Sequence, residues 1–319
     1  MKNKCVKSHL NFGVILVGDK DIDNVAANSS IHWFPGHMRV SQRLLKENLS
    51  RVDLIVELID ARAPRSSRNP FFKDITSGNK ARVVVMSKGD LADRRFSEAW
   101  IKHIENTERV RALTVDCKNA KSVKNVIDVL KEVLSNFPKK RSLGRLMRAM
   151  IVGIPNVGKS TLINSLAKKS KARVENRPGV TRTAQWIHLD NGLDLLDTPG
   201  TLPSRFESPE VGLNLAYTGA IKDAVYDLEY VAMNLIEFLS ANHSKQVKAR
   251  FGVDFSEFAR PIEKLEAFGR LRGMLLRGGE VDLNRAALSL LDEYRSGKLG
   301  RITLEIPRES KKLLGDHNL

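Results

Sequence analysis

The sequence contains only two cysteines, Cys5 and Cys117. Two cysteines exclude a disulfide framework and a cysteine-rich zinc site, and they suit a reducing compartment, so we expect a cytoplasmic protein. Long apolar runs are also missing, and no stretch reaches the length that a membrane-spanning helix needs. The early stretch "NFGVILVG" is short and is followed by "DKDIDN" without a clear cleavage site, so we predict no signal peptide.

The sequence has fewer acidic residues than basic residues. The 37 Asp and Glu residues compare with 53 Lys and Arg residues, which leaves a formal net charge of +16. This excess predicts attraction to a polyanion, with nucleic acid ahead of an anionic membrane surface. The apolar content of 42% is typical of a globular protein. A length of 319 residues allows one large or two ordinary domains.

Apolar runs alternate with amphipathic segments between residues 31 and 205. The runs "DLIVELIDA", "ARVVVMS", "VRALTVDC" and "LMRAMIVGI" are typical of buried parallel strands. Helical spacing is present in "MRVSQRLLKENLSRV", "SEAWIKHIE", "SVKNVIDVLKEVLSNF" and "KSTLINSLAKK". The stretch "TAQWIHLDNGLDLLDT" predicts two strands joined by a turn at Asn191-Gly192. We therefore predict an α/β fold with a mainly parallel sheet and one antiparallel hairpin.

After about residue 205 the strand pattern stops and four segments fit helices: "EVGLNLAYTGAIKDAV", "LEYVAMNLIEFLSANH", "PIEKLEAFGRLRGMLL" and "DLNRAALSLLDEYRSGKLG". We expect a flexible extension over 1–30, an α/β domain over 31–205, an all-helical domain over 206–305 and a disordered tail over 306–319.

The stretch "GIPNVGKST" has glycines at 153 and 158 followed by Lys159 and Ser160, between a predicted strand and a predicted helix. This is the context of a phosphate-binding loop. Backbone N–H groups from Asn156 to Thr161, with Val157 and Gly158 between them, would surround the phosphates, Lys159 would reach the β- and γ-phosphates, and Ser160 would bind Mg²⁺. The alternative is a chance glycine turn, which the flanking strand and helix argue against.

Two further segments could complete such a site. In "LLDTPG", Asp197 ends a strand and could hold a Mg²⁺-bound water, while the Gly200 N–H could contact a γ-phosphate. In "NRPGVTRTAQW", Thr181 would complete the Mg²⁺ shell and act in catalysis, with Thr183 as second choice. The alternative for this threonine segment is a solvated polar loop.

A base-reading loop is predicted at "MSKGD", after the second apolar run. Asp90 could accept both N–H groups on the edge of guanine, which adenine does not offer, and Lys88 could lay its stem along the base. Ser87 stands where an asparagine is usual, and a hydroxyl can still donate and accept. Downstream, "TVDCKN" (Asp116, Cys117, Lys118) resembles a loop whose N–H groups meet guanine O6. The alternatives are a polar turn at "MSKGD" and a small buried residue at Cys117.

The order of these motifs resembles the circularly permuted GTPases. Together with "HWFPGHMRVSQRLL", "IVELIDARAPRSSRNP", "RPGVTRTAQW" and "LLDTPGTL", residues 31 to 305 resemble the ribosome biogenesis GTPase A (YlqF/RbgA) family. The resemblance implies a GTPase that binds the maturing large (50S) ribosomal subunit, is stimulated by it and releases after hydrolysis. It also implies a helical domain that contacts rRNA, no stable membrane association and a monomer.

The family also suggests two residue roles. The histidine of its Pro-Gly-His-Met motif corresponds to His37, which would orient or deprotonate water. Phosphate loops with an asparagine at the place of Asn156 resemble those that coordinate K⁺. The residues alone leave other interpretations open: His37 could cap a helix starting near Met38, and Asn156 could simply form a turn. Thr201 departs from the apolar residue that the family usually has after its Asp-x-x-Gly motif.

Basic residues concentrate in "PKKRSLGRLMR", "AKKSKAR" and "ARAPRSSR". Each could be a solvated face, but several together favour phosphate contacts. In the helical part the candidate rRNA contacts are Lys264, Arg270, Arg272 and Arg277. Two other functions stay open: a GTPase acting on another RNA or at a membrane surface, and an RNA-binding scaffold with nucleotide as a structural ligand.

Overall fold

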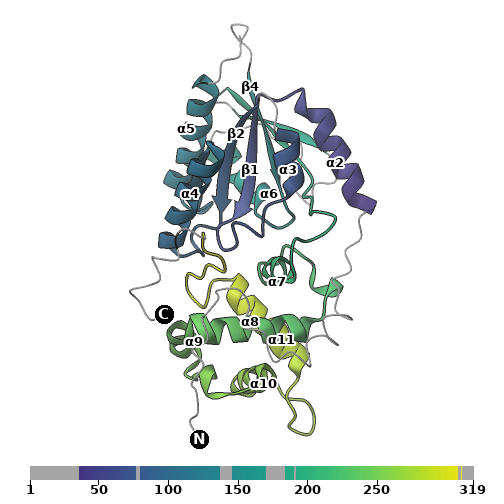
Figure 1. The fold of residues 1–319 in the computed structure, drawn as a ribbon, viewed down its shortest axis with the longest axis vertical. Helices are drawn as coiled ribbons and strands as arrows, with labels where there is room; N and C mark the ends of the chain where they lie inside the picture. Colours follow the sequence, from purple (N-terminus) through teal and green to yellow (C-terminus); the bar gives the residue numbers. More distant parts are fainter. Residues whose placement is uncertain are drawn as a thin grey trace, which may run out of the picture.

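A computed structural model describes residues 36–76, 80–136, 146–169, 184–189, 192–307 and 310. Figure 1 shows a sheet with flanking helices at one end of the molecule and a group of helices at the other. The expected extension over 1–30 and most of the expected tail lie outside the described residues.

The sheet has six strands in the order β3-β2-β1-β4-β6-β5. Every neighbouring pair is parallel except the β5–β6 hairpin, which confirms the predicted α/β fold. The strands are β1 (Leu54–Asp60), β2 (Ala81–Ser87), β3 (Arg111–Thr114), β4 (Met147–Gly153), β5 (Gln185–Leu189) and β6 (Leu193–Asp197). Strand β3 stops at Thr114, short of the predicted end at Cys117, so the following residues are free to form a loop.

Helices cover both faces of the sheet. They are α2 (Gly36–Leu49), α3 (Pro70–Thr76), α4 (Arg94–Glu108), α5 (Ala120–Asn136) and α6 (Lys159–Lys169). On β1, Leu54, Val56 and Leu58 pack with α5 and α6, while Ile55 and Ile59 belong to clusters on the other face. The whole of β1 is therefore buried, which explains its near-continuous apolar sequence.

The remaining helices build a second core. They are α7 (Pro209–Tyr217), α8 (Leu228–Asn242), α9 (Ser244–Phe251), α10 (Pro261–Leu271) and α11 (Leu283–Arg295). Three of them, α7, α8 and α11, start at local signals, because Ser208, Asp227 and Asp282 accept hydrogen bonds from backbone N–H groups of the first turn. Within the described part of the chain, no helix is long and apolar enough to cross a membrane.

The chain returns to the sheet after α11. The Ile302 N–H donates to the Leu91 carbonyl at 3.1 Å, and the Leu304 N–H donates to the Arg62 carbonyl at 2.7 Å. The Trp100 indole N–H donates to the Glu305 carbonyl at 2.9 Å. Figure 1 shows this yellow segment between the sheet and the helices. Residues 302–305, the return segment, thus fasten the helical part to the loops at the carboxyl ends of β1 and β2.

Candidate nucleotide-binding site

The predicted phosphate loop joins β4 to α6. A Cβ atom on Gly153 would lie 2.5 Å from the Leu58 carbonyl oxygen, so the close approach of the two strands requires glycine. Gly158 has φ +99° and Asn156 has φ 54°, which is the left-handed region that these residue types tolerate best. The loop therefore curls at the N-terminus of α6, where backbone N–H groups attract anions.

Lys159 is buried against its own loop. Its ammonium group donates to the carbonyls of Gly153 at 3.0 Å and Ile154 at 2.8 Å. Burial lowers the pKa of Lys159 to about 8, and the nearby Asp197 carboxylate opposes that shift. A phosphate bound at this loop would favour the charged form of the lysine.

The loop that follows β6 lies directly against the phosphate loop. Asp197 is buried at the end of β6, in register with Ile151 of β4. A Cβ atom on Gly200 would come within 2.8 Å of Pro155 and 2.9 Å of the Lys159 Nζ atom. The Thr201 N–H donates to the Gly153 carbonyl at 3.3 Å. The structure thus brings together two motifs that are far apart in the sequence.

The oxygen ligands where the phosphate loop meets the Asp197–Gly200 loop are of the kind that Mg²⁺ binds. Ser160 is a half-buried residue in the first turn of α6, and Asp197 supplies a carboxylate. A hydroxyl and a carboxylate suit a hard cation that keeps several waters. Thr181, the predicted third ligand, and Thr183 both lie outside the described residues.

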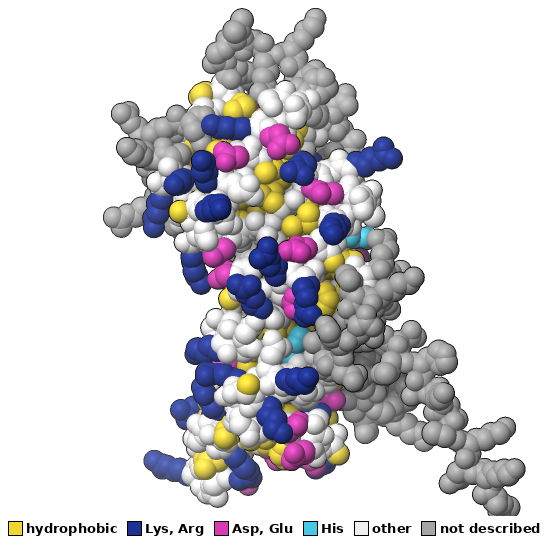
Figure 2. Space-filling view, turned by 90° about the vertical axis from the view of Figure 1, so that its left-hand side faces the viewer, with side chains coloured by type: hydrophobic (Ala, Val, Ile, Leu, Met, Phe, Trp, Pro, Cys, Tyr) yellow, Lys and Arg dark blue, Asp and Glu magenta, His cyan; other side chains and the backbone are white. Residues whose placement is uncertain are grey.

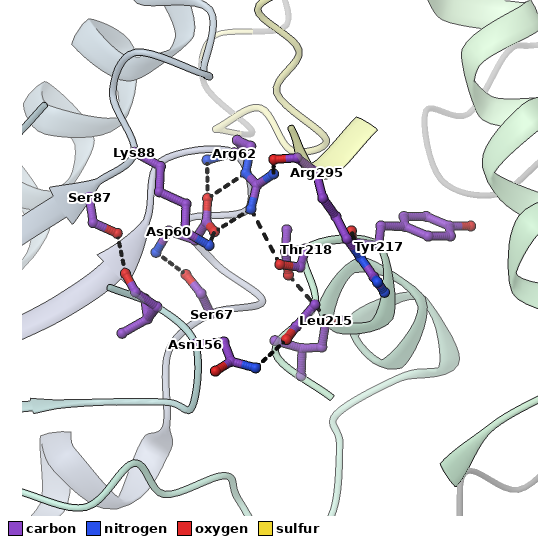
Figure 3. A network of polar contacts seen from close by, with 12 residues as sticks. Asp60, Arg62, Ser67, Ser87, Lys88, Asn156, Leu215, Tyr217, Thr218 and Arg295 are labelled. Atoms are coloured by element: carbon purple, nitrogen blue, oxygen red, sulfur yellow. Dashed lines mark hydrogen bonds and ion pairs between the residues drawn. The ribbon is translucent and has the colours of Figure 1, made fainter. Parts of the chain in front are cut away.

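The base loop is tied to the phosphate loop by Ser87. The Ser87 hydroxyl lies 2.5 Å from the Val157 carbonyl and 3.0 Å from the Ile59 carbonyl. Its single proton can serve one acceptor at a time, and the shorter distance favours Val157. Figure 3 shows this contact between the end of β2 and the phosphate loop.

The two loops predicted to surround the base lie side by side. The Gly89 N–H donates to the Val115 carbonyl at 3.1 Å, and the Lys118 ammonium group pairs with Asp90 at 3.1 Å. The Asp116 carboxylate accepts from the Lys118 N–H at 2.8 Å, which shapes a turn. The Ser165 hydroxyl of α6 lies 3.0 Å from the Cys117 carbonyl and 2.9 Å from the Thr161 carbonyl of its own helix. Burial, aided by Asp116 and Asp90, raises the pKa of Cys117 to about 11, so its thiol is not a nucleophile near pH 7.

Asn156 makes a contact that the sequence did not indicate. Its side-chain amide donates to the Gly219 carbonyl, in the turn after α7, at 2.8 Å. Its left-handed backbone fits the turn interpretation, and this hydrogen bond adds a link from the phosphate loop to the helical part (Figure 3).

Sequence reasoning also gave no role to Asp60 and Arg62, although both lie in a stretch that carries the family resemblance. Asp60 ends β1, is buried, and contacts Arg62 and the base-loop residue Lys88. The position of an acidic residue at the end of a buried strand was the one signal in the sequence that could have drawn attention to Asp60. Its partner Lys88, however, is distant in the sequence, so the ion pair could not be predicted.

Two other predicted site residues are His37 and Lys264. His37 lies within α2, which begins at Gly36, but its side chain is outside the described part of the structure. Lys264 was expected to face RNA, yet it is only 5% exposed and its ammonium group pairs with Glu237 at 2.6 Å. A buried, paired lysine does not present its charge to a phosphate, so the structure argues against that role.

Known proteins match this chain over most of its length. Ribosome biogenesis GTPase A from Priestia megaterium is 43% identical over 291 residues, which cover 89% of this chain and all of that protein. The chain belongs to the ribosome biogenesis GTPase A family. The protein of the same name from Bacillus cereus is 42% identical and covers 88% of this chain and 95% of its own length.

Two further comparisons agree. A family model described as 50S ribosome-binding GTPase matches residues 148–250. The crystal structure of GNP-bound YlqF from T. maritima superposes with a TM-score of 0.61 at 26% identity, covering 84% of this chain and 99% of that one. As a ribosome biogenesis GTPase A, the protein is a GTP-hydrolysing enzyme of ribosome biogenesis that uses guanine nucleotide and, as such GTPases generally do, Mg²⁺. The base loop precedes the phosphate loop in its sequence, which is the circular permutation.

Proposed function

We propose that this GTPase is an assembly factor in the cytoplasm that binds the maturing large (50S) ribosomal subunit through rRNA, as a monomer, and releases after hydrolysis. The observation that carries the proposal is the meeting of both base loops, the phosphate loop and the Asp197–Gly200 loop at the carboxyl ends of the parallel strands, directly beside the helical part. Ligands of open α/β sheets bind at this edge.

The nucleotide contacts follow from the positions of the loops. Asp90 reads the guanine edge, Lys88 packs along the base, and Ser87 holds the base loop to the phosphate loop. In the second base loop, Asp116–Lys118, the contact with guanine O6 is assigned to the Cys117 N–H, because the Asp116 and Lys118 N–H groups donate to the Ser122 hydroxyl and the Asp116 carboxylate. The phosphates would lie at Asn156–Thr161 and Gly200, and Ser160, Thr181 and Asp197 would hold the Mg²⁺ ion.

Hydrolysis needs a positioned water and compensation of developing charge. In this proposal His37 orients or deprotonates the water, Thr181 acts as the ordering switch, and Lys159 stabilises the charge on the phosphoryl oxygens. Thr201 follows Gly200 but is fully buried, which favours a packing role for it. A K⁺ ion beside Asn156 would supply additional positive charge near the phosphates.

The helical part supplies candidate RNA contacts at Arg270, Arg272 and Arg277. Arg272 shares the buried carboxylate of Glu293 with Arg250 and Lys298. One carboxylate cannot neutralise three cations, so this cluster keeps an excess of positive charge. Figure 2 shows Lys and Arg side chains along the displayed face, from the sheet end down to the helical end.

The deciding experiment is GTP turnover with and without large ribosomal subunits, in KCl and in NaCl. We expect subunits to raise turnover, and His37→Ala to remove most of that stimulation while GDP binding stays within about twofold, because the histidine acts on water rather than on the base. Faster turnover in KCl than in NaCl supports the ion at Asn156, and equal turnover argues for a simple turn. Full subunit-stimulated turnover in His37→Ala would overturn the catalytic assignment.

A further inference from the structure

Asp60 is a buried carboxylate placed between the two nucleotide loops. It is the last residue of β1 and lies in register with Ser87, the first residue of the base loop. Strand β1 is also the neighbour of β4, which leads into the phosphate loop. The side chain is 3% exposed, so its charge needs partners within the protein.

Arg62 fixes the orientation of this carboxylate. The Arg62 N–H and Nε donate to Asp60 Oδ1 at 2.9 and 3.0 Å, and Nη2 donates to Oδ2 at 2.9 Å. Oδ2 is shared with the base loop, because the Lys88 ammonium group also lies 2.9 Å from it. Burial alone would raise the pKa of Asp60, but the Arg62 and Lys88 charges outweigh it and hold the pKa well below its usual range.

Lys88 has a backbone that lysine seldom adopts. Its φ is 57°, a left-handed value that costs about 1 kcal/mol for a residue with a Cβ atom. Such strain persists only where the surroundings enforce it. Here the Leu91 N–H donates to the Lys88 carbonyl at 2.9 Å, and the side chain is held at its far end by Asp60. With the ammonium group held there, the aliphatic stem is the part left to contact a base.

We propose that Asp60 is a positioning residue of the base site, which holds the Lys88 side chain so that its stem packs on the nucleobase. This inference rests on the proposed role of Ser87–Asp90 as the base loop. Asp60 does not touch the nucleotide itself and acts through Lys88.

The helical part supports the same arrangement. The Arg62 guanidinium donates to the Thr218 carbonyl at 3.3 Å and to the Arg295 carbonyl at 3.4 Å, and it lies 5.3 Å from the centre of the Tyr294 ring. Figure 3 shows the line of contacts from Lys88 through Asp60 and Arg62 to the end of α7. The orientation of Asp60 is therefore fixed from both parts of the molecule.

A double-mutant cycle tests the inference. GDP affinity is measured by fluorescence with a labelled GDP for the unaltered protein, Asp60→Asn, Lys88→Met and the combined variant. We expect Asp60→Asn to weaken binding about tenfold when Lys88 is present and by less than about twofold in the Lys88→Met protein, because the effect passes through that lysine. Equal weakening in both backgrounds, or none in either, overturns the inference.

Removing the Asp60 charge leaves the Arg62 guanidinium buried, so the single variant can lose stability. Asp60→Asn combined with Arg62→Gln avoids this, and we expect the same dependence on Lys88. Glu57→Gln is the matched control, because Glu57 is a buried carboxylate on the same strand that pairs with Arg68 and Arg82 instead. It should lower the unfolding midpoint and leave GDP affinity unchanged.

A second readout separates this inference from the proposed base site. Asp60→Asn should weaken GDP and IDP binding equally, because the lysine stem contacts the ring face and not the amino group that inosine lacks. Asp90→Asn should weaken GDP binding more than IDP binding. If neither Lys88→Met nor Asp90→Asn changes GDP affinity, the base-site assignment itself fails. If they do and the cycle shows no coupling, only the role of Asp60 fails.

Discussion

Ser87 stands where an asparagine is usual, yet the bond from the base loop to the phosphate loop is present. A serine side chain is shorter than an asparagine side chain, but Ser87 is at the end of β2 and its hydroxyl reaches the Val157 carbonyl directly. Ser87 is 1% exposed and lies beside Gly158 of the phosphate loop. The hydroxyl therefore links the two loops, which is the structural task expected of the asparagine.

This arrangement predicts the effect of Ser87→Ala. Losing one buried hydrogen bond between the two loops costs about 1 kcal/mol, so GDP and ADP affinity should both fall about fivefold. The preference for GDP over ADP should not change, because the proposed reader of guanine is Asp90 and not Ser87. Isothermal titration with both nucleotides checks this, with Ser135→Ala on the exposed side of α5 as control. A changed GDP-to-ADP ratio would assign base reading to Ser87.

Residues whose role is local could be predicted, and residues whose role depends on the fold could not. Gly153, Gly158 and Lys159 belong to one continuous motif, and their backbone requirements are visible in the sequence. Asp60 matters because β1 and β2 end side by side, which no spacing in the sequence reveals. Lys264 was expected at the surface because lysines usually are, but its ion pair with Glu237 of α8 forms only when α8 and α10 pack.

At the scale of elements, the C-terminal end of α7 is where the two parts of the molecule meet. Its last carbonyls have no partners within the helix and carry the negative end of the helix dipole. Arg295 donates to the Ala216 and Tyr217 carbonyls at 2.8 and 3.2 Å. Arg62 and Asn156 donate to the next two, Thr218 and Gly219. The helix end is thus held both by α11 and by the nucleotide-binding loops.

Most of the order of helices and strands followed from the sequence, because apolar runs and period-3.6 patterns are local, but α3 and α9 were not predicted. The contact of α7 with the phosphate loop did not follow from the sequence, because it depends on a carbonyl and an asparagine that belong to different parts of the chain.

The contact predicts a specific result for Asn156→Gly. Glycine keeps the left-handed backbone but removes the amide that holds the Gly219 carbonyl. Amide hydrogen exchange over residues 215–221 should become several-fold faster, since the loss of about 1 kcal/mol raises the population of the opened turn. Exchange in α10, which is remote from the phosphate loop, serves as the internal control. Unchanged exchange over 215–221 would show that Asn156 does not hold α7.

At the scale of the whole molecule, Glu305 joins the return segment to the GTPase part and to α7. Its carboxylate accepts from the Arg65 and Ser66 N–H groups at 2.7 and 3.0 Å and from the Asn214 amide at 3.2 Å. Burial raises the pKa of Glu305 despite these hydrogen bonds. At a pH between the unfolded pKa, near 4.5, and the raised folded pKa, the folded protein therefore retains a proton that the unfolded chain has released.

Glu305 makes the stability of the folded protein depend on pH. Unfolding releases a proton between the unfolded and folded pKa values, so this residue lowers the free energy of unfolding as pH rises through that window. Glu305→Gln should flatten that slope and, because its amide nitrogen cannot accept, reduce stability at pH 5 by roughly 1–3 kcal/mol. Urea unfolding from about pH 5 to pH 8 measures both effects, with the exposed Glu132→Gln as control. An identical slope in Glu305→Gln and the unaltered protein would contradict the raised pKa.

The net charge of +16 predicts that the proposed binding to large ribosomal subunits is strongly salt-dependent, because each phosphate bound by the protein releases counterions. Replacing Arg270 or Arg277 by glutamine should reduce the slope of log affinity against log salt by about one for each phosphate that is no longer bound. Lys264→Met is the matched control in the same helical part. Its ammonium group is buried against Glu237, so this variant should lower the unfolding midpoint and leave the salt slope unchanged. A slope that falls for Lys264→Met but not for Arg270 and Arg277 would place the RNA-binding surface elsewhere on the molecule.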